Sequence, residues 1–276
     1  MEVKQIIKEN NFEFKKKFGQ NFITDTNLLQ TICDDAEIGK NDEVLEIGVG
    51  AGTLTKILSQ NAKKVVGYEI DKSLVDVLKF SLAGCENTEI IFKDFLKEES
   101  SQIAKNFSEP FKVVANLPYY ITTNIIFKLI EKDFAVKSLT LMVQKEVAER
   151  LVAKEGTKDY GTISAELGAI GEVKISRIVD RKMFYPEPNV DSAVINIKID
   201  RNKYQIDDWT TFQNVVKASF SMRRKTLSNC FKSFFGMNID NIKKLLAELE
   251  LSPNIRGEEL SIEQFVKLSN LIKKYM

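Results

Sequence analysis

Residues 43–55 read EVLEIGVGAGTLT. The first five residues predict a short β-strand, and the residues after the last glycine predict a helix that continues to about Asn61. Between them, glycines at every second position let the backbone approach a ligand closely, beside the free N–H groups of a helix N-terminus. The stretch therefore predicts a strand, a glycine-rich ligand-binding turn and a helix.

The spacing of these glycines differs from that of a dinucleotide-binding turn. The pattern is G-x-G-x-G, and Thr53 stands where G-x-G-x-x-G requires its last glycine. This departure makes a nicotinamide dehydrogenase less favoured. It favours instead a nucleoside ligand that carries no pyrophosphate.

Composition excludes several classes of protein. The 276 residues include no histidine, which excludes Ser-His-Asp triads, His-based zinc sites and histidine general bases. The three cysteines are far apart, so we expect no disulfide framework and a reducing, cytoplasmic compartment. We find no apolar run long enough to span a bilayer and no secretory signal in residues 1–17. The net charge of +1 means that only local basic clusters can argue for nucleic acid.

Polar side chains stand at the ends of the next three predicted strands. Glu69 lies near the end of a strand over 65–71, and Asp94 and Asn116 directly follow the two strands after it. Strands that alternate with helices predict a parallel, doubly wound α/β sheet, in which ligands bind outside the carboxyl ends of the strands. With the glycine turn, four successive strand ends therefore predict one ligand site.

Two of these carboxylates have structural alternatives. Glu69 lies about 20 residues beyond the glycine turn, where an acid can accept hydrogen bonds from ribose hydroxyls, but it could also be a solvated strand end. Asp94 could bind an adenine amino group, or it could cap the following turn.

The fourth strand leads into Asn116-Leu117-Pro118-Tyr119-Tyr120. Pro118 lacks an N–H and keeps Leu117 out of the helical region, so the strand ends in a rigid elbow that presents Asn116 and Tyr119. An amide can hydrogen-bond the edge of a flat polar ring, and an aromatic side chain can cover its face. The alternative is a strand-to-loop corner with partly buried tyrosines.

The chain divides into three predicted parts. Residues 1–22 form a basic arm, residues 23–200 an α/β domain, and residues 209–276 a helical domain that follows a polar linker. Two basic clusters lie beside phenylalanines, a combination that suits an RNA backbone, although each could be a solvated surface. Their members are Lys15, Lys16, Lys17, Arg223, Arg224 and Lys225.

Several motifs now resemble a known family. Residues 46–52 resemble the S-adenosylmethionine motif of class I (Rossmann-like) methyltransferases, and residues 116–119 resemble the N-L-P-Y motif of N6-adenine methyltransferases that act on ribosomal RNA. Residues 18–22, 184–192 and 220–227 resemble stretches of the KsgA-type small-subunit (16S) ribosomal RNA adenine N6,N6-dimethyltransferases. The similarity runs from about residue 12 to the C-terminus.

The resemblance implies transfer of methyl groups from S-adenosylmethionine to two adjacent adenosines near the 3′ end of 16S rRNA, late in assembly of the small subunit. It implies a cytoplasmic, monomeric enzyme whose partner is the immature small ribosomal subunit. The positions that match methyl-donor contacts, two of them in the glycine turn, are Asn21, Ile23, Gly48, Gly50, Glu69, Asp94 and Asn116. The rings expected to hold a flipped adenine are Tyr119 and Phe184.

We expect the Asn116 side-chain oxygen and the Leu117 carbonyl to accept hydrogen bonds from the adenine amine, with Pro118 holding both in place. The methylated amine is acidic, so neither a general base nor a metal is expected. Tyr120 has no assigned role.

Alternatives remain at this level. The chain could act chiefly as an assembly factor that binds the small subunit. A DNA adenine methyltransferase typically carries D/N-P-P-Y, whereas here Leu117 precedes a single proline. Relatives that methylate 23S rRNA share the fold and the first motifs, but the stretch that begins at Arg223 favours the small-subunit enzyme.

Overall fold

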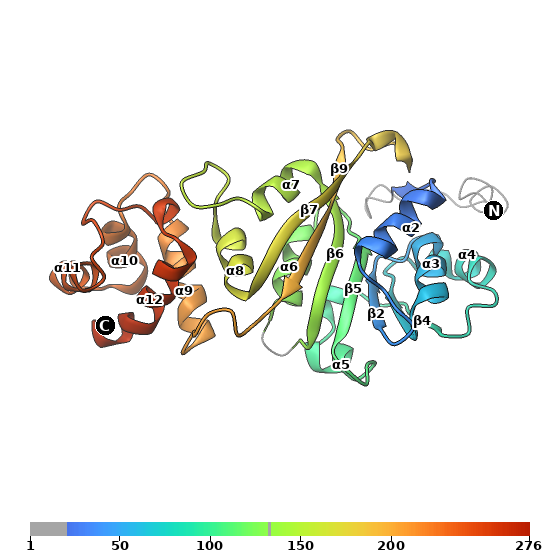
Figure 1. The fold of residues 1–276 in the computed structure, drawn as a ribbon, viewed down its shortest axis with the longest axis horizontal. Helices are drawn as coiled ribbons and strands as arrows, with labels where there is room; N and C mark the ends of the chain where they lie inside the picture. The colour runs from blue at the N-terminus through green and yellow to red at the C-terminus, as the bar shows by residue number, and fades with distance from the viewer. Residues whose placement is uncertain (1–20, 132–133) are drawn as a thin grey trace. The chain divides into compact units, whose positions relative to one another are not determined.

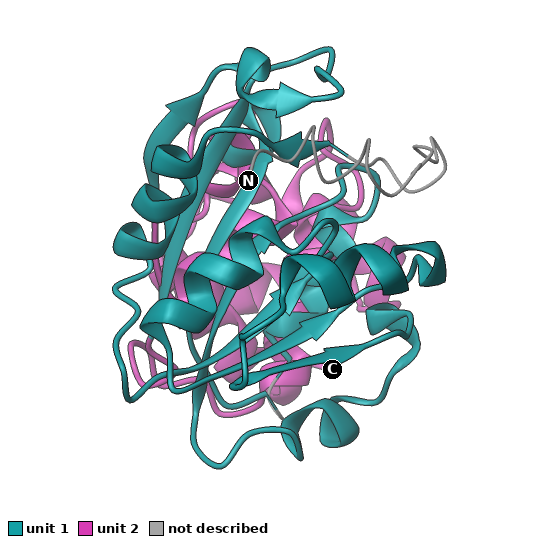
Figure 2. Ribbon diagram, turned by 90° about the vertical axis from the view of Figure 1, so that its right-hand side faces the viewer, with its two compact units in different colours: residues 1–148, 174–199 teal, residues 149–173, 200–276 magenta. Residues whose placement is uncertain are grey.

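The structure is a computed structural model, and it describes residues 21–131 and 134–276. Its contacts divide the chain into two compact units (Figure 2), of which the first comprises 1–148 and 174–199 and the second 149–173 and 200–276. The division after residue 199 falls where the linker was predicted. Residues 149–173 belong to the second unit, however, whereas the sequence placed them in the α/β domain. The N-terminal lysine cluster lies outside the described residues.

The first unit contains a seven-stranded sheet with the order β4-β3-β2-β5-β6-β9-β7 (Figure 1). The five strands from β4 to β6 are parallel, and β9 runs antiparallel to β6. This is the predicted α/β, Rossmann-like fold. The strands are β2 (Glu43–Ile47), β3 (Lys64–Tyr68), β4 (Thr88–Ile91), β5 (Phe111–Asn116), β6 (Val136–Gln144), β7 (Gly171–Val179) and β9 (Ser192–Ile199).

Burial explains why the central strands are short apolar runs. All five residues of β2 are buried, and Val113, Val114 and Ala115 of β5 are at most 1% exposed. A parallel strand that is covered on both faces has no alternating polar side, so its sequence is nearly continuously apolar. The predicted third strand, 89–93, begins one residue earlier and ends two residues earlier in the structure.

In the part of the chain that the structure describes, six α-helices connect these strands or flank them. Asp25 is the N-cap of α2, because its Oδ1 accepts the backbone N–H of Asn27 at 2.8 Å and of Leu28 at 3.2 Å. The helix that follows β3 starts as a 3₁₀ turn, Lys72–Leu74, before its α-helical part. The helices are α2 (Thr26–Asp35), α3 (Thr53–Asn61), α4 (Val75–Ser81), α5 (Ser100–Ala104), α6 (Thr122–Leu129) and α7 (Lys145–Leu151).

A separate two-stranded sheet joins the start of the described chain to a distant loop. Strand β1 (Phe22–Ile23) pairs antiparallel with β8 (Phe184–Tyr185), placing Phe22 opposite Tyr185 and Ile23 opposite Phe184. Two-residue strands carry no periodic pattern, and the sequence did not predict this pairing. The pairing places the segment before α2 beside the carboxyl edge of the main sheet. Phe22 and Ile23 both line the cavity at that edge, which is described below.

The strand order creates one topological switch point. From β2 the chain continues to β3 on one side, whereas β5 lies on the other side of β2. The turns that follow β2 and β5 therefore adjoin at the carboxyl edge, which is where open α/β sheets bind ligands. A Cβ atom on Gly48 would lie 3.7 Å from the backbone oxygen of Asn116. The glycine turn and the Asn-Leu-Pro-Tyr turn are thus direct neighbours.

The second unit is helical. Its core packs Tyr160 and Ala165 with Phe212, Phe231 and Phe265, and this packing explains why residues 149–173 belong here. Its α-helices are α8 (Thr162–Ile170), α9 (Trp209–Phe220), α10 (Leu227–Phe235), α11 (Ile239–Glu248) and α12 (Ile262–Leu271). Across residues 21–131 and 134–276, no helix has the length and apolarity needed to cross a membrane.

Candidate active site

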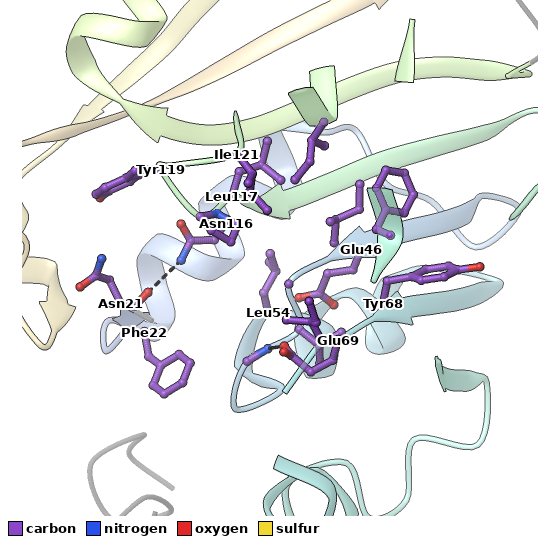
Figure 3. Close-up of a pocket in the computed structure, with 18 of the residues that line it drawn as sticks. Asn21, Phe22, Glu46, Leu54, Tyr68, Glu69, Asn116, Leu117, Tyr119 and Ile121 are labelled. Atoms are coloured by element: carbon purple, nitrogen blue, oxygen red, sulfur yellow. Dashed lines mark hydrogen bonds between the residues drawn. The ribbon is translucent and has the colours of Figure 1, made fainter. Parts of the chain in front are cut away.

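A cavity of about 1000 Å³, counting its open mouth, lies at the carboxyl edge of the first unit's sheet. Its walls come from the ends of β2 to β5, from the turns that follow them and from β1 (Figure 3). Ten of the residues predicted for the site line it: Asn21, Ile23, Gly48, Gly50, Glu69, Asp94, Asn116, Leu117, Pro118 and Tyr119. The four strand ends that were grouped from the sequence therefore line one cavity.

The Asn116 amide has a defined orientation. Its Nδ2 donates a hydrogen bond of 3.0 Å to the backbone oxygen of Asn21 (Figure 3). This bond turns the nitrogen toward Asn21 and leaves the amide oxygen as the acceptor for a ligand. The neighbouring Leu117 N–H donates to the Met142 carbonyl of β6 at 3.1 Å. The turn is therefore held from two sides before any ligand binds.

Glu69 closes the glycine turn. Its Oε2 accepts the N–H of Gly50 and its Oε1 accepts the N–H of Asp71, each at 2.8 Å. The side chain is 5% exposed, and burial raises the pKa of this carboxyl despite those hydrogen bonds. Each carboxylate oxygen has a second lone pair, so Glu69 can still accept a hydrogen bond from a ligand hydroxyl.

Asp94 caps the 3₁₀ turn Phe95–Lys97, because its Oδ1 accepts the N–H of Leu96 at 3.0 Å. The capping alternative is therefore confirmed. Asp94 also lines the cavity, and its contact with an adenine amine stays a prediction.

Gly50 is required by both conformation and space. Its φ is +59°, and a Cβ there would lie 2.6 Å from Cε1 of Phe22. A side chain would therefore be strained and would displace a ring that lines the cavity.

Two tyrosines follow Pro118 along the cavity wall. Tyr119 is half-buried, whereas Tyr120 is 58% exposed. Burial raises the pKa of the Tyr120 phenol, and the carboxylates of Asp94 and Glu69 raise it further. Tyr120 had no role assigned from the sequence. It lines the cavity, and the negative charges of Asp94 and Glu69 act on its phenol.

Phe184 differs from its prediction. It is 4% exposed and packs in the core with Leu29 and Val194, and it is not among the residues that line the cavity. The buried position follows from its pairing with Ile23 in the small sheet. In this structure its ring is therefore not presented to the cavity, and a role in holding adenine remains only a prediction.

The sequence analysis missed Glu46 as a site residue. This carboxyl is 1% exposed, lines the cavity, and has an Oε2 with no hydrogen-bond partner among the described residues. Burial raises its pKa to about 8, and the Glu69 carboxylate contributes to the increase. Its signal was present, because an acidic residue inside a buried strand just before a glycine turn is unusual.

The basic cluster of the second unit divides into two kinds of residue. Arg223 donates from Nη2 to the Lys158 carbonyl and lies 3.5 Å from an oxygen of Glu258, so it is partly engaged within the unit. Arg224 and Lys225 are exposed like Arg223, but their side chains form no hydrogen bond or ion pair with the described residues. These two cations are therefore the better candidates for contact with RNA phosphates.

The cavity suits S-adenosylmethionine. Carboxylates from Glu69 and Asp94 provide acceptors for ribose hydroxyls and an adenine amine, and Ile70 and Leu96 provide apolar surface for a base. The glycine turn allows close approach of the backbone. Within the described ranges, no group of three His, Cys, Asp or Glu side chains is placed to hold a metal ion.

A Rossmann-like sheet, a glycine turn backed by a carboxylate, and an Asn-Leu-Pro-Tyr turn at the switch point define the class of S-adenosylmethionine-dependent methyltransferases. The family model described as ribosomal RNA adenine dimethylase matches residues 11–274. The chain belongs to this family, and it is an S-adenosylmethionine-dependent ribosomal RNA adenine dimethyltransferase. The match rules against the dehydrogenase and DNA methyltransferase alternatives.

Curated relatives match over nearly the full length. The chain is 43% identical over 272 residues to the "Ribosomal RNA small subunit methyltransferase A" of Clostridioides difficile, covering 98% of this chain and 94% of the relative. It is 45% identical over 279 residues to the protein of the same name in Bacillus mycoides, with the same coverage.

Solved structures agree on the fold. A dimethyladenosine transferase from Plasmodium falciparum superposes with a TM-score of 0.75 at 28% identity, covering 92% of this chain and 98% of the other. The 23S rRNA methyltransferase ErmE superposes with a TM-score of 0.69 at 26% identity, covering 91% and 99%.

Proposed function

We propose that the chain methylates the N6 amines of two adjacent adenosines near the 3′ end of 16S rRNA, late in assembly of the small ribosomal subunit. The observation that carries the chemistry is the Asn116 amide, oriented by Asn21 at the switch point of the sheet. The choice of the small subunit is supported by relatives at 43–45% identity that are named small-subunit methyltransferases. ErmE, named for 23S rRNA, is only 26% identical.

In this proposal, the cavity residues hold the methyl donor. Glu69 accepts hydrogen bonds from the ribose, Asp94 contacts the adenine amine, and Gly48 and Gly50 let the backbone approach the ligand. Asn21 and Ile23 cover the site from the N-terminal side, since both line the cavity. The donor supplies an electrophilic methyl group on a sulfonium.

The residues around Asn116 prepare the acceptor amine. The amine's lone pair is delocalised into the adenine ring, which makes it a weak nucleophile. The Asn116 side-chain oxygen and the Leu117 carbonyl accept its two hydrogens and so favour a localised lone pair aimed at the methyl group. Because both acceptors are fixed beforehand, little reorganisation accompanies the reaction. The amine nitrogen attacks the methyl carbon as the sulfur–methyl bond breaks and S-adenosylhomocysteine leaves. The methylated, cationic amine then loses a proton to solvent, so no histidine is needed.

The target adenine must leave its stack to enter the cavity, and the Tyr119 ring offsets part of that cost by stacking on the base. We propose that the arm at residues 1–22 and the helical unit, through Arg224 and Lys225, bind the RNA backbone. We further propose that the enzyme acts as a cytoplasmic monomer on the immature subunit.

The test uses labelled S-adenosylmethionine with two substrates, undermethylated small subunits and protein-free 23S rRNA, followed by mapping of the labelled base. We expect label on two adjacent adenosines near the 3′ end of 16S rRNA. Label confined to 23S rRNA would overturn the proposed substrate.

A further inference from the structure

A buried serine touches the tyrosine of the active-site turn. The phenol oxygen of Tyr119 and Oγ of Ser192 are 2.7 Å apart, the normal length of an O–H···O hydrogen bond. Ser192 is 0% exposed and begins β9. The two residues are 73 positions apart in the sequence, so no local pattern reveals the contact.

The sheet explains why the two meet. Asn116 lies opposite Met142 on β6, and Ser192 lies opposite Gln144 two residues further along the same strand. Because β9 is antiparallel to β6, its first residue stands at the edge where β5 and β6 end. The Tyr119 side chain reaches across the end of β6 to this hydroxyl.

Tyr119 is the aromatic residue best placed to act by its ring. Tyr68 and Phe95 contact each other edge to face, with centroids 5.5 Å apart, and Phe22 packs against Gly50. Phe184 lies in the core. Beside Asn116, this leaves Tyr119, held at its hydroxyl end, and the largely exposed Tyr120.

Resting on the proposed function, we propose that Ser192 is a positioning residue for the acceptor base. Fixing the backbone and the phenol oxygen of Tyr119 fixes χ1 and the long axis of its ring. Because a phenol O–H lies in the plane of its ring, the hydrogen bond to the buried Ser192 hydroxyl also restrains rotation of the ring about that axis. The hydroxyl is then occupied by Ser192, and Tyr119 presents only its ring face to the adenine. Ser192 thereby prepares the stacking surface without touching either substrate.

The experiment is a double-mutant cycle on the full-length chain with Ser192→Ala, Tyr119→Phe and the double variant. The readouts are kcat and KM for undermethylated small subunits, the Kd for S-adenosylmethionine, and the melting temperature. Each single variant is expected to lower kcat/KM for the RNA by roughly tenfold, with the donor Kd unchanged. The double variant should be no worse than either single one, because both remove the same contact.

Ser219→Ala is the matched control. Ser219 is a buried serine of the helical unit whose hydroxyl donates to the Val215 carbonyl at 2.7 Å, and its loss should leave both kinetic constants unchanged. The proposal would be overturned if the loss of kcat/KM in the double variant were the product of the two single losses. It would also be overturned if the donor affinity fell as much as kcat/KM, or if Ser192→Ala had wild-type kinetics. A wild-type enzyme that fails to label 16S adenosines would instead contradict the proposed function.

Discussion

At the scale of single residues, the glycine turn combines a backbone requirement with a packing requirement. Gly50 and Gly84 both have positive φ, at +59° and +85°, but only Gly50 has a neighbour in the way of a Cβ. Substitution of Gly84 therefore tests backbone strain alone, whereas substitution of Gly50 adds a collision with Phe22.

We predict that Gly84→Ala lowers the free energy of unfolding by about 1 kcal/mol and leaves donor binding intact. Gly50→Ala should also raise the Kd for S-adenosylmethionine by at least about tenfold, because Phe22 must move within the cavity wall. Isothermal titration and thermal melts measure the two effects. Equal donor affinity in both variants would contradict this assignment of Gly50.

Glu46 gives the protein a specific dependence on pH. Its pKa is about 8 in the folded chain and near 4.5 in the unfolded chain. Between pH 4.5 and pH 8 the carboxyl is protonated in the folded chain and ionised in the unfolded chain, so unfolding releases a proton. The free energy of unfolding therefore falls as pH rises, by up to ~1.4 kcal/mol per pH unit. The contribution is complete below pH 4.5 and lost as pH passes through 8.

We predict that Glu46→Gln removes this decline, so that its stability relative to wild type increases from about pH 5 to about pH 8 and is then constant. Denaturant melts across this range provide the measurement. Glu86→Gln, which changes an exposed carboxyl, is the control. Parallel stability curves for wild type and Glu46→Gln would show that Glu46 is not buried as a neutral acid.

At the scale of elements, helix α6 supports the cavity wall that contains Asp94 and Leu96. Lys128 on this helix donates to the carbonyl oxygen of Leu96 at 3.1 Å and to that of Glu98, and its Nζ lies 5.4 Å from the centre of the Phe95 ring. The turn after β4 is thus tied to the helix that follows the Asn-Leu-Pro-Tyr turn.

We predict that Lys128→Met weakens donor binding several-fold to tenfold while kcat at saturating donor changes little, because the turn that carries Asp94 loosens. Lys79→Met, at an exposed cation of α4, should have no such effect. A lowered melting temperature with an unchanged donor Kd would mean that the lysine stabilises only the fold.

Elements with local signals could be predicted from the sequence. Strands β2, β3 and β5 contain apolar runs, and Gly48, Glu69 and Asn116 stand at their ends. The features that the sequence did not reveal depend on distant partners. Pairing of β1 with β8 buries Phe184, and packing of Tyr160 and Ala165 against Phe212 places residues 149–173 in the second unit.

The same distinction between local signals and distant partners applies to the site. Asn116, Glu69 and Asp94 could be grouped because the rule for parallel sheets places strand ends together. The bond from Asn116 to Asn21 and that between Tyr119 and Ser192 join residues 95 and 73 positions apart, and only the folded chain shows them.

At the scale of the whole molecule, the net charge of +1 leaves RNA binding to local clusters. Arg224 and Lys225 are exposed, whereas Arg223 is engaged by Lys158 and Glu258. Removal of the exposed pair should therefore weaken RNA binding without loosening the helical unit.

We predict that Arg224→Ala with Lys225→Ala reduces the slope of log K for rRNA against log salt by about 1.4 to 1.8 and leaves donor binding unchanged. Lys243→Ala with Lys244→Ala removes the same charge from α11 and is the control. An unchanged salt slope, measured by filter binding, would exclude the pair from the RNA interface.

The central claim is that the Asn116 amide prepares the adenine amine, and Asn116→Ala tests it most directly. The measurement is single-turnover methylation of undermethylated small subunits beside the Kd for S-adenosylmethionine, with Asn229→Ala, at an exposed amide of the helical unit, as the control. We predict a loss in rate on the order of 10²–10³ with less than about a tenfold change in donor Kd. A variant that methylates at close to the wild-type rate would contradict the account.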